Sequence, residues 1–356
     1  MSITARSESG FTLVELLVSM TITAIVMAGA FMVFSQATRM NQVAAETISV
    51  NRDQANAMDL VVRDLLQVGQ GLPSSKVVSV PNGTGITINR PGPTAATVSL
   101  SDWPAVLPGP GSGPSVDGGP ATDVLTLLYV DTMFVTSTGQ APAATVAANG
   151  ASMTVTAPIT LEVGDLVLFD VSGRDAVQVA TGVTVDASSL QTVQFAAGDK
   201  LNFNQRTATA GTILQIQPVA NTAFTANVSR LRMITYYIDA NRTPAALIRC
   251  LNNQCVGSNP IPGQVVALGV ENLQFSFDIV DGDTNPSNIK MTATDLAGGG
   301  ACGTDPCSTN QIRKANVALS MRSRHRVQQL NDFVHRLLTT QVSLRNLSFV
   351  DRYPTT

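Results

Sequence analysis

The pattern of hydrophobic positions divides the chain into two unequal parts. Residues 11–34, FTLVELLVSMTITAIVMAGAFMVF, are almost all apolar, and Glu15 carries the only charge among them. As an α-helix rising about 1.5 Å per residue, this run spans roughly 36 Å, which exceeds a bilayer core of about 30 Å. A lone carboxylate inside a membrane costs free energy, so we expect Glu15 to have a partner.

After this run the apolar positions recur in steps of three and four residues, and no proline occurs before Pro73. These positions are Met40, Val43, Ala44, Ile48, Ala55, Met58, Val62, Leu65 and Leu66. The spacing predicts an amphipathic helix that continues the first one over residues 36–69. Asp59 and Arg63 are placed to form an i,i+4 ion pair on its exposed side. We expect the apolar face to pack on a β-sheet.

Residues 70–356 show short alternating runs separated by turn residues, which is typical of β-strands. The predicted strands are residues 86–89, 123–130, 153–156, 166–171, 176–179, 213–217, 231–239, 265–277, 317–322 and 342–345. The glycine-rich residues 108–120 lack the lysine of a phosphate-binding loop and predict a flexible loop. The expected fold class is therefore α+β, with a long N-terminal helix packed on antiparallel β-sheets.

Charge and composition restrict the function only slightly. The net charge of −3 does not indicate a nucleic-acid partner, and 13% charged residues is a low share for a cytosolic enzyme. Basic residues outnumber acidic ones over residues 312–356. A solvated strand edge rich in arginine is the simpler interpretation of this tail, and a DNA-binding surface is the alternative.

The four cysteines form two pairs with the same Cys-x4-Cys spacing. The pairs are Cys250 with Cys255 and Cys302 with Cys307. An even number of cysteines at short spacing suits disulfides in an oxidising compartment. Four thiolates at this spacing also suit a zinc site in a reducing compartment.

No sequence motif for catalysis is present. The two histidines, His325 and His335, lie outside any metalloprotease pattern, and no Gly-x-Ser-x-Gly elbow occurs. His325 lies within RSRHRV, where a solvated basic strand is the expected setting. We therefore do not expect the chain to be an enzyme.

A cluster of oxygen-bearing side chains occurs in the segment DIVDGDTN. Its members are Asp278, Asp281, Asp283 and Asn285. Oxygen ligands at such spacing suit calcium, although the glycine and the glutamate of an EF-hand loop are missing. The segment thus predicts a polar hairpin turn, with a weak calcium site as the alternative, and no other cofactor is expected.

The residues before the apolar run do not suit an ordinary secretory signal. MSITARSESG carries one arginine offset by one glutamate, and the apolar run continues past Ala30. A plain uncleaved anchor would leave Glu15 unexplained. Cleavage between Gly10 and Phe11 accounts for the glycine ahead of the apolar run and for the charge of Glu15, because it creates an amine on Phe11. That amine, or the amine of a neighbouring subunit, can neutralise Glu15.

Residues 10–16, GFTLVEL, resemble the N-terminus of prepilins, which occurs in type IV pilins and in type II secretion pseudopilins. The resemblance implies that a prepilin peptidase cuts between Gly10 and Phe11 and that Phe11 is N-methylated. It also implies that Glu15 aligns each subunit with its neighbour during filament assembly. The later stretches ATDVLTLLYVD, GVENLQF and LRN resemble, in their order, the large PilW-type minor pilins. Met32 stands where many major pilins have a proline, which favours a minor component.

The same resemblance implies the organisation of the whole chain. Residues 1–10 would be a leader peptide, 11–35 a transmembrane helix, 36–69 an amphipathic helix and 70–356 a β-rich globular pilin-like domain. The protein would cross the bacterial inner membrane once, with a short cytoplasmic N-terminus and a periplasmic domain that enters the pilus. In that oxidising compartment we expect the disulfides to form within each pair, Cys250–Cys255 and Cys302–Cys307, where they would rigidify surface loops.

The implied function is that of a minor pilin that initiates, assembles or tips a type IV pilus, a filament for adhesion, motility or DNA uptake. Its partners would be the prepilin peptidase, other minor and major pilins, the assembly machinery and a tip adhesin. A J-type minor pseudopilin of type II secretion is one alternative. A filament-tip adhesin or DNA receptor that uses the arginine-rich tail is another.

Overall fold

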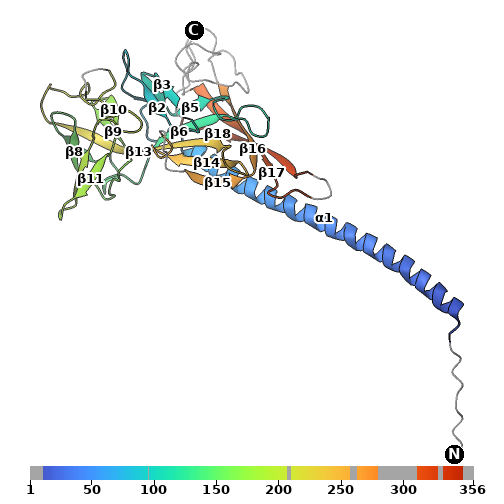
Figure 1. Ribbon diagram of the computed structural model, residues 1–356. Helices are drawn as coiled ribbons and strands as arrows, with labels where there is room; N and C mark the ends of the chain where they lie inside the picture. The colour runs from blue at the N-terminus through green and yellow to red at the C-terminus, as the bar shows by residue number, and fades with distance from the viewer. Residues whose placement is uncertain are drawn as a thin grey trace, which may run out of the picture. The chain divides into compact units, whose positions relative to one another are not determined.

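A single long helix precedes a series of β-strands in the computed structural model of the protein (Figure 1). The structure describes residues 11–94, 96–206, 210–256, 263–279, 311–327 and 332–347. Every strand pairing among these residues is antiparallel. The expected α+β, pilin-like class is therefore confirmed. The chain divides into two compact units, residues 1–51 with 323–334, and residues 52–322 with 335–356.

Helix α1 runs from Leu13 to Gln67, as the sequence predicts to within two residues at each end. Its 55 residues correspond to about 83 Å of helix. The helix contains no proline, so no backbone hydrogen bond is lost along it. It ends where Gly69 and Gly71 adopt φ values of 75° and 69°, which favour glycine.

The largest sheet has eleven strands and is organised around its longest one. Its strands are β5 (Val106–Gly109), β6 (Val124–Val130), β7 (Ala143–Val146), β8 (Ser152–Thr156), β9 (Leu166–Val171), β10 (Arg174–Val179), β11 (Gly182–Val185), β12 (Leu190–Gln194), β13 (Phe224–Asp239), β14 (Ala246–Leu251) and β15 (Gln264–Leu268). The first half of β13 pairs with β7 and β9, and its second half pairs with β6 and β14. One strand of 16 residues thus joins two groups of strands.

The first group, β7 to β12, surrounds a hydrophobic core of its own. Phe169 of β9 and Phe195 pack edge to face in this core, with ring centroids 5.5 Å apart. In Figure 1 these strands lie at one end of β13, while β14 to β18 lie toward its other end. A smaller core at that other end contains Val124, Tyr237 and Ile248.

A separate sheet has the order β16–β17–β18, and two small sheets have two strands each. The strands are β16 (Val270–Ile279), β17 (Ile312–Arg322) and β18 (His335–Ser343), then β1 (Val77–Ser79) with β4 (Asp102–Pro104), and β2 (Ile88–Arg90) with β3 (Ala96–Val98). In the three-stranded sheet, β16 and β17 alternate between buried apolar residues and partly exposed polar ones. One face of this sheet therefore contributes to a core.

Three predicted strands are broken, absent or largely displaced in the structure, and β13 and β17 begin seven and five residues before their predicted starts. The predicted strand 265–277 is broken at Gly269, which has a φ of 80° and would place a Cβ 2.6 Å from the carbonyl oxygen of Arg322. Its two parts, β15 and β16, therefore belong to different sheets. Residues 213–217 form turns, and Ile213 and Ile216 are apolar because they fill the core around β7 to β12. The last strand lies earlier than the predicted 342–345, since β18 ends at Ser343.

The buried face of α1 is also rotated relative to the predicted stripe. Within the second unit the helix buries Gln54, Ala57, Met58, Val61, Asp64 and Leu65. Of the predicted stripe, Ala55 and Leu66 are exposed and Val62 is half-buried. The prediction placed only apolar residues on this face. The real face includes two polar side chains that find hydrogen-bond partners on the sheets.

Candidate processing and assembly site

The first turn of α1 is closed by reciprocal hydrogen bonds between Thr12 and Glu15. The backbone N–H of Thr12 donates to Oε2 of Glu15 at 3.0 Å, and the backbone N–H of Glu15 donates to Oγ1 of Thr12 at 3.3 Å. The Thr12 hydroxyl also donates to the same carboxylate oxygen at 3.0 Å. This is a capping box, Thr-x-x-Glu, which satisfies two N–H groups that a helix start leaves without partners.

The capping box holds the Glu15 carboxylate at the start of the helix. Phe11 directly precedes Thr12, the other member of the capping box. Every hydrogen bond to this carboxylate from the described residues comes from Thr12. Phe11 is 86% exposed, and Gly10 lies outside the described residues. The predicted pairing of Glu15 with an amine on Phe11 stays a prediction, because it depends on cleavage and on neighbouring subunits.

All side chains from Phe11 to Gln42 are exposed within this single chain. Among the described residues, α1 is the one helix long and apolar enough to cross a membrane. An apolar surface of this length is unfavourable in water, so it requires a bilayer or other apolar helices around it. Membrane anchoring and packing in a filament both meet this requirement.

Residues 5–31 match the prokaryotic N-terminal methylation motif. The motif points to a type IV pilin or pseudopilin. For this pilin-like chain it implies processing by a prepilin peptidase, assembly with other pilins and a structural role. No curated protein and no solved structure matches the chain.

A buried ion pair joins the C-terminal half of the pilin-like helix to the largest sheet. Arg249 of β14 donates from Nε to Oδ2 of Asp64 at 2.6 Å and from a terminal nitrogen to Oδ1 at 3.1 Å. The hydroxyl of Tyr236, on β13, donates to the same Oδ2 at 2.6 Å. Burial and the neighbouring Asp64 charge raise the pKa of Tyr236 far above its ordinary value, so this hydroxyl keeps its proton and donates.

Gln54, three turns earlier on α1, binds the three-stranded sheet. Its side-chain nitrogen donates to the carbonyl oxygens of Leu319 in β17 at 2.7 Å and Arg336 in β18 at 3.2 Å. At the end of the helix, the side chain of Asn346 donates to the carbonyl oxygen of Leu66 at 2.9 Å. The second unit therefore holds α1 through both of its larger sheets, by contacts that an apolar stripe cannot indicate.

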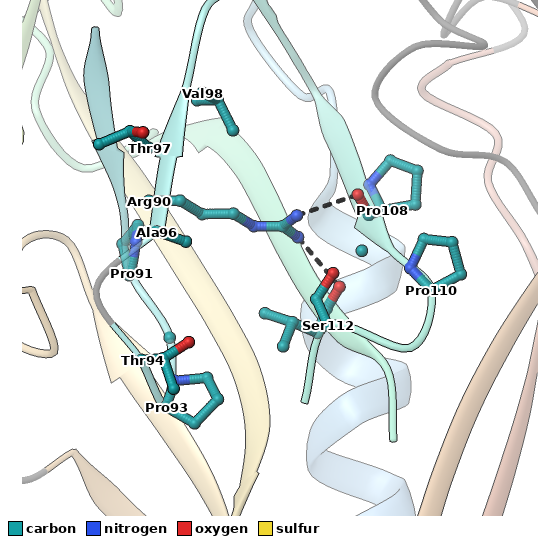
Figure 2. Close-up of a pocket in the computed structure, with 13 residues that line it drawn as sticks. Arg90, Pro91, Pro93, Thr94, Ala96, Thr97, Val98, Pro108, Pro110 and Ser112 are labelled. Atoms are coloured by element: carbon teal, nitrogen blue, oxygen red, sulfur yellow. Dashed lines mark hydrogen bonds between the residues drawn. The ribbon is translucent and has the colours of Figure 1, made fainter. Parts of the chain in front are cut away.

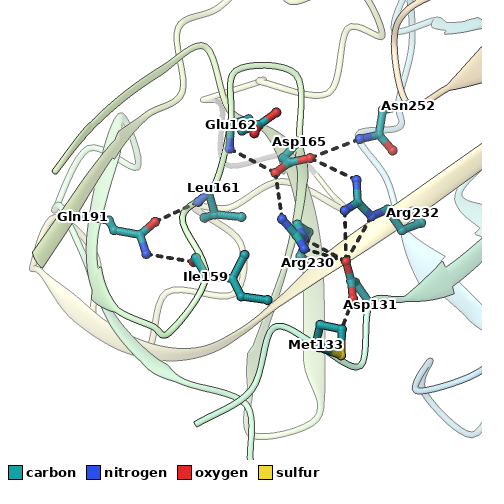
Figure 3. A network of polar contacts seen from close by, with 10 residues as sticks. All are labelled: Asp131, Met133, Ile159, Leu161, Glu162, Asp165, Gln191, Arg230, Arg232 and Asn252. Carbon is teal, nitrogen blue, oxygen red and sulfur yellow. Dashed lines mark hydrogen bonds and ion pairs between the residues drawn. The ribbon is translucent and has the colours of Figure 1, made fainter. Parts of the chain in front are cut away.

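A second polar cluster lies where β6, β9 and β13 meet (Figure 3). Arg230 and Arg232 are two residues apart on β13, so they point to the same face of the sheet. Both donate to Oδ2 of Asp131, at 2.7 to 3.1 Å. Both also lie 3.6 Å from Asp165, which precedes β9. Two positive and two negative charges thus balance each other in a largely buried site.

The environment of Asp131 favours its charged form. Burial alone would raise the pKa of this carboxyl, but the backbone N–H of Met133 and the guanidinium of Arg230 donate hydrogen bonds to it. Together with the charges of Arg230 and Arg232, these bonds hold the pKa of Asp131 below its ordinary value. Asp131 therefore stays ionised at neutral pH, and its ion pairs with Arg230 and Arg232 tie the end of β6 to β13.

Cys250 and Cys255 form a disulfide, as predicted, with their Cα atoms 5.9 Å apart. Both residues are buried, and they belong to the small core that contains Tyr237 and Ile248. The expected role as a surface-loop staple is therefore wrong for this bridge, since its sulfurs form part of a core. Cys302 and Cys307 lie outside the described residues.

Of the calcium candidates, the structure describes only Asp278. Its carboxylate accepts hydrogen bonds from the side chains of Asn316 on the adjacent β17, at 2.9 Å, and of Gln341 on β18 beyond it, at 3.0 Å. Asp281, Asp283 and Asn285 lie outside the described residues. In the part of the chain that the structure describes, no group of three or more His, Cys, Asp or Glu side chains could hold a metal ion.

The histidines and the basic tail contact other parts of the chain. Nδ1 of His335 lies 3.0 Å from a carboxylate oxygen of Glu271, and Nδ1 of His325 lies 3.2 Å from Oε1 of Glu46. Arg322 forms an ion pair with Asp117. The expected basic strand around His325 is wrong, because β17 ends at Arg322 and residues 323–326 form a loop.

Proposed function

We propose that the protein is a minor pilin of the PilW type that helps to initiate, assemble or tip a type IV pilus. The observation that carries the proposal is the methylation motif over residues 5–31, which is continuous with a fully exposed apolar helix. The far end of that helix is fixed to a β-rich unit through Gln54 and Asp64. Such a chain offers other subunits a helix and presents a separate folded surface.

The proposed topology follows from the same features. Residues 1–10 serve as the leader, residues 11–35 cross the bacterial inner membrane and residues 70–356 fold in the periplasm. A buried disulfide between Cys250 and Cys255 supports an oxidising compartment for this domain. Prepilin peptidase cuts between Gly10 and Phe11, and Phe11 is then methylated.

Glu15 is proposed to pair with the Phe11 amine of a neighbouring subunit during assembly. The capping box supports this role because it holds the carboxylate at the exposed start of α1. In a filament core of low dielectric constant, loss of the carboxylate leaves the amine unpaired, at a cost of several kcal/mol. Docking of the subunit should then fail, while cleavage and membrane insertion continue.

The test compares strains in which Glu15→Gln or the exposed control Asp59→Asn is the sole copy of the gene. N-terminal mass spectrometry should find a methylated Phe11 as the first residue in both variants. Surface pili, counted after shearing, should fall more than tenfold in Glu15→Gln and stay normal in Asp59→Asn. A start at Met1 or after Ala30 would contradict the processing.

A gene deletion completes the test. If the deletion abolishes pili while Glu15→Gln leaves them normal, the pairing role of Glu15 is wrong. The deletion strain should keep type II secretion. Loss of secreted enzymes with normal pili would instead assign the chain to the J-type pseudopilins.

A further inference from the structure

Arg90, the last residue of β2, is a buried cation whose hydrogen bonds go to uncharged groups. It is 7% exposed, and its guanidinium donates to the carbonyl oxygen of Pro108 at 3.0 Å (Figure 2). It also donates to the carbonyl oxygens of Leu107 at 2.8 Å and Val124 at 3.0 Å. Its Nε has no hydrogen-bond partner. No described Asp or Glu forms an ion pair with it.

Carbonyl dipoles solvate this charge but do not neutralise it. Burial lowers the pKa of Arg90 to about 10, so the side chain remains protonated at neutral pH. A buried charge without a counter-charge is unfavourable by several kcal/mol. Arg90 is thus unlike Arg230 and Arg249, whose carboxylate partners lie within 3 Å.

A pocket of about 310 Å³ opens beside this guanidinium. Its lining includes Pro91, Pro93, Pro108, Pro110, Thr97 and Ser112. Gly109 allows Arg90 to approach, because a Cβ at that position would lie 2.6 Å from a terminal nitrogen of the guanidinium. The site therefore combines a charge, two hydroxyls and apolar proline rings.

We propose that this pocket binds a carboxylate carried on a small apolar group, with Arg90 as its counter-charge. A guanidinium pairs well with a carboxylate, and the hydroxyls of Thr97 and Ser112 can donate to it. The proline rings suit a short hydrocarbon body. They also argue against a phosphate, because proline has no backbone N–H and the site offers one positive charge. The volume lies at the low end for small-molecule sites.

The test uses the full chain in detergent micelles, with propionate as the probe and propionamide as its uncharged match. At constant ionic strength, propionate should raise the melting temperature and propionamide should not. Arg90→Lys should weaken propionate binding about tenfold, because lysine keeps the charge but loses the planar donors. Arg174→Gln is the control, since Arg174 also donates to backbone carbonyls but is exposed, at the start of β10.

Equal shifts with propionate and propionamide, or unchanged binding in Arg90→Lys, would overturn the proposal. If Arg90→Lys does not fold, Ser112→Ala tests the same site, and it should weaken binding at least about threefold through the lost hydroxyl. Short peptides with free or amidated C-termini distinguish the sources of the carboxylate. Tighter binding of the free-acid peptide than of propionate indicates the end of a partner chain, and the reverse order indicates a free organic acid.

Discussion

Glu15 and Asp64 are both carboxylates on α1, but their surroundings give them different roles. Glu15 is exposed, and the hydrogen bonds to its side chain come from a residue three positions away. Asp64 is 3% exposed and binds Arg249 and Tyr236 at once. The first carboxylate remains accessible to another subunit, whereas the second is committed to the fold of its own chain.

Asp64→Asn should lower the free energy of unfolding of the β-rich unit by about 3 kcal/mol, because it leaves the charge of Arg249 without a counter-charge. Urea unfolding followed by the near-ultraviolet signal of the buried aromatic residues measures the change. Asp59→Asn is the matched control on the same helix. Its exposed pair with Arg63 should contribute less than about 1 kcal/mol. Similar losses in the two variants would contradict the role given to Asp64.

The pH dependence of the unfolding free energy should show how much the charged Asp131 carboxylate contributes to stability. The folded state lowers its pKa, so its contribution is fully present above the unfolded value of about 3.9 and is lost as the pH falls through the lower folded value. The difference in unfolding free energy between wild type and Asp131→Asn should therefore be constant from about pH 7 to 5 and shrink below about pH 4. Asp175 and Asp199, whose pKa values burial raises, have the opposite dependence and cancel in this difference. A difference that stays constant down to pH 2 would exclude the ion pairs as its source.

At the scale of elements, the sequence predicts those whose pattern is long or dense in β-branched residues. Residues 166–171 form β9 with the predicted bounds, and the 55-residue helix follows from its apolar run and its freedom from proline. The strands β3, β7 and β11 were missed because they are short and partly exposed, with alanine, threonine or glycine in them. Their pairing depends on neighbours far along the chain, which a local pattern does not contain.

The residues of the candidate site also divide into those that a local sequence pattern predicts and those that it does not. The processing motif is a local signal, because it consists of a glycine directly before the apolar run and of a phenylalanine and a glutamate within its first residues. The Thr-x-x-Glu capping box at residues 12–15 is also a local signal, but it was not predicted. The roles of Gln54 and Asp64 were not predicted, because the predicted buried stripe of α1 contained only apolar side chains. Arg90 and the four-residue cluster around Asp131 depend on segments up to about a hundred residues apart, so no local pattern reveals them.

The turn after α1 requires glycine for two separate reasons. Gly71 has a φ of 69°, and a Cβ there would lie 2.7 Å from Cβ of Val130. Gly85 has a similar φ of 81°, but nothing lies within 4 Å of its added Cβ. Gly71→Ala should therefore lower the unfolding free energy by about 2 kcal/mol or more, and Gly85→Ala by about 1 kcal/mol. Thermal unfolding of the two variants compares them, and equal losses would mean that the contact with Val130 is irrelevant.

At the scale of the whole molecule, the exposed and buried parts of α1 predict where the chain can be shortened. A chain that begins at Met40 loses the apolar run but keeps Gln54, Met58 and Asp64, so it should be soluble and rich in β-structure. A chain that begins at residue 70 loses these contacts and should aggregate or remain unfolded. Circular dichroism and gel filtration of the two chains test this, and a folded, soluble chain from residue 70 would show that the helix is not part of the core.

The cluster around Asp131 also marks the two ends of an insertion. The backbone N–H of Asp131 donates to the carbonyl oxygen of Arg230 at 2.8 Å, although almost a hundred residues separate them. Strands β6 and β13 are thus the two arms of one hairpin, and residues 132–229 are its loop, grown into a module with its own core. From that module, Asp165 forms ion pairs with both arginines at its neck. A chain with this module replaced by a two-residue turn would keep the pairing of β6 with the second half of β13, but it would expose the buried Trp103, whose ring packs edge to face on Phe203 of the module.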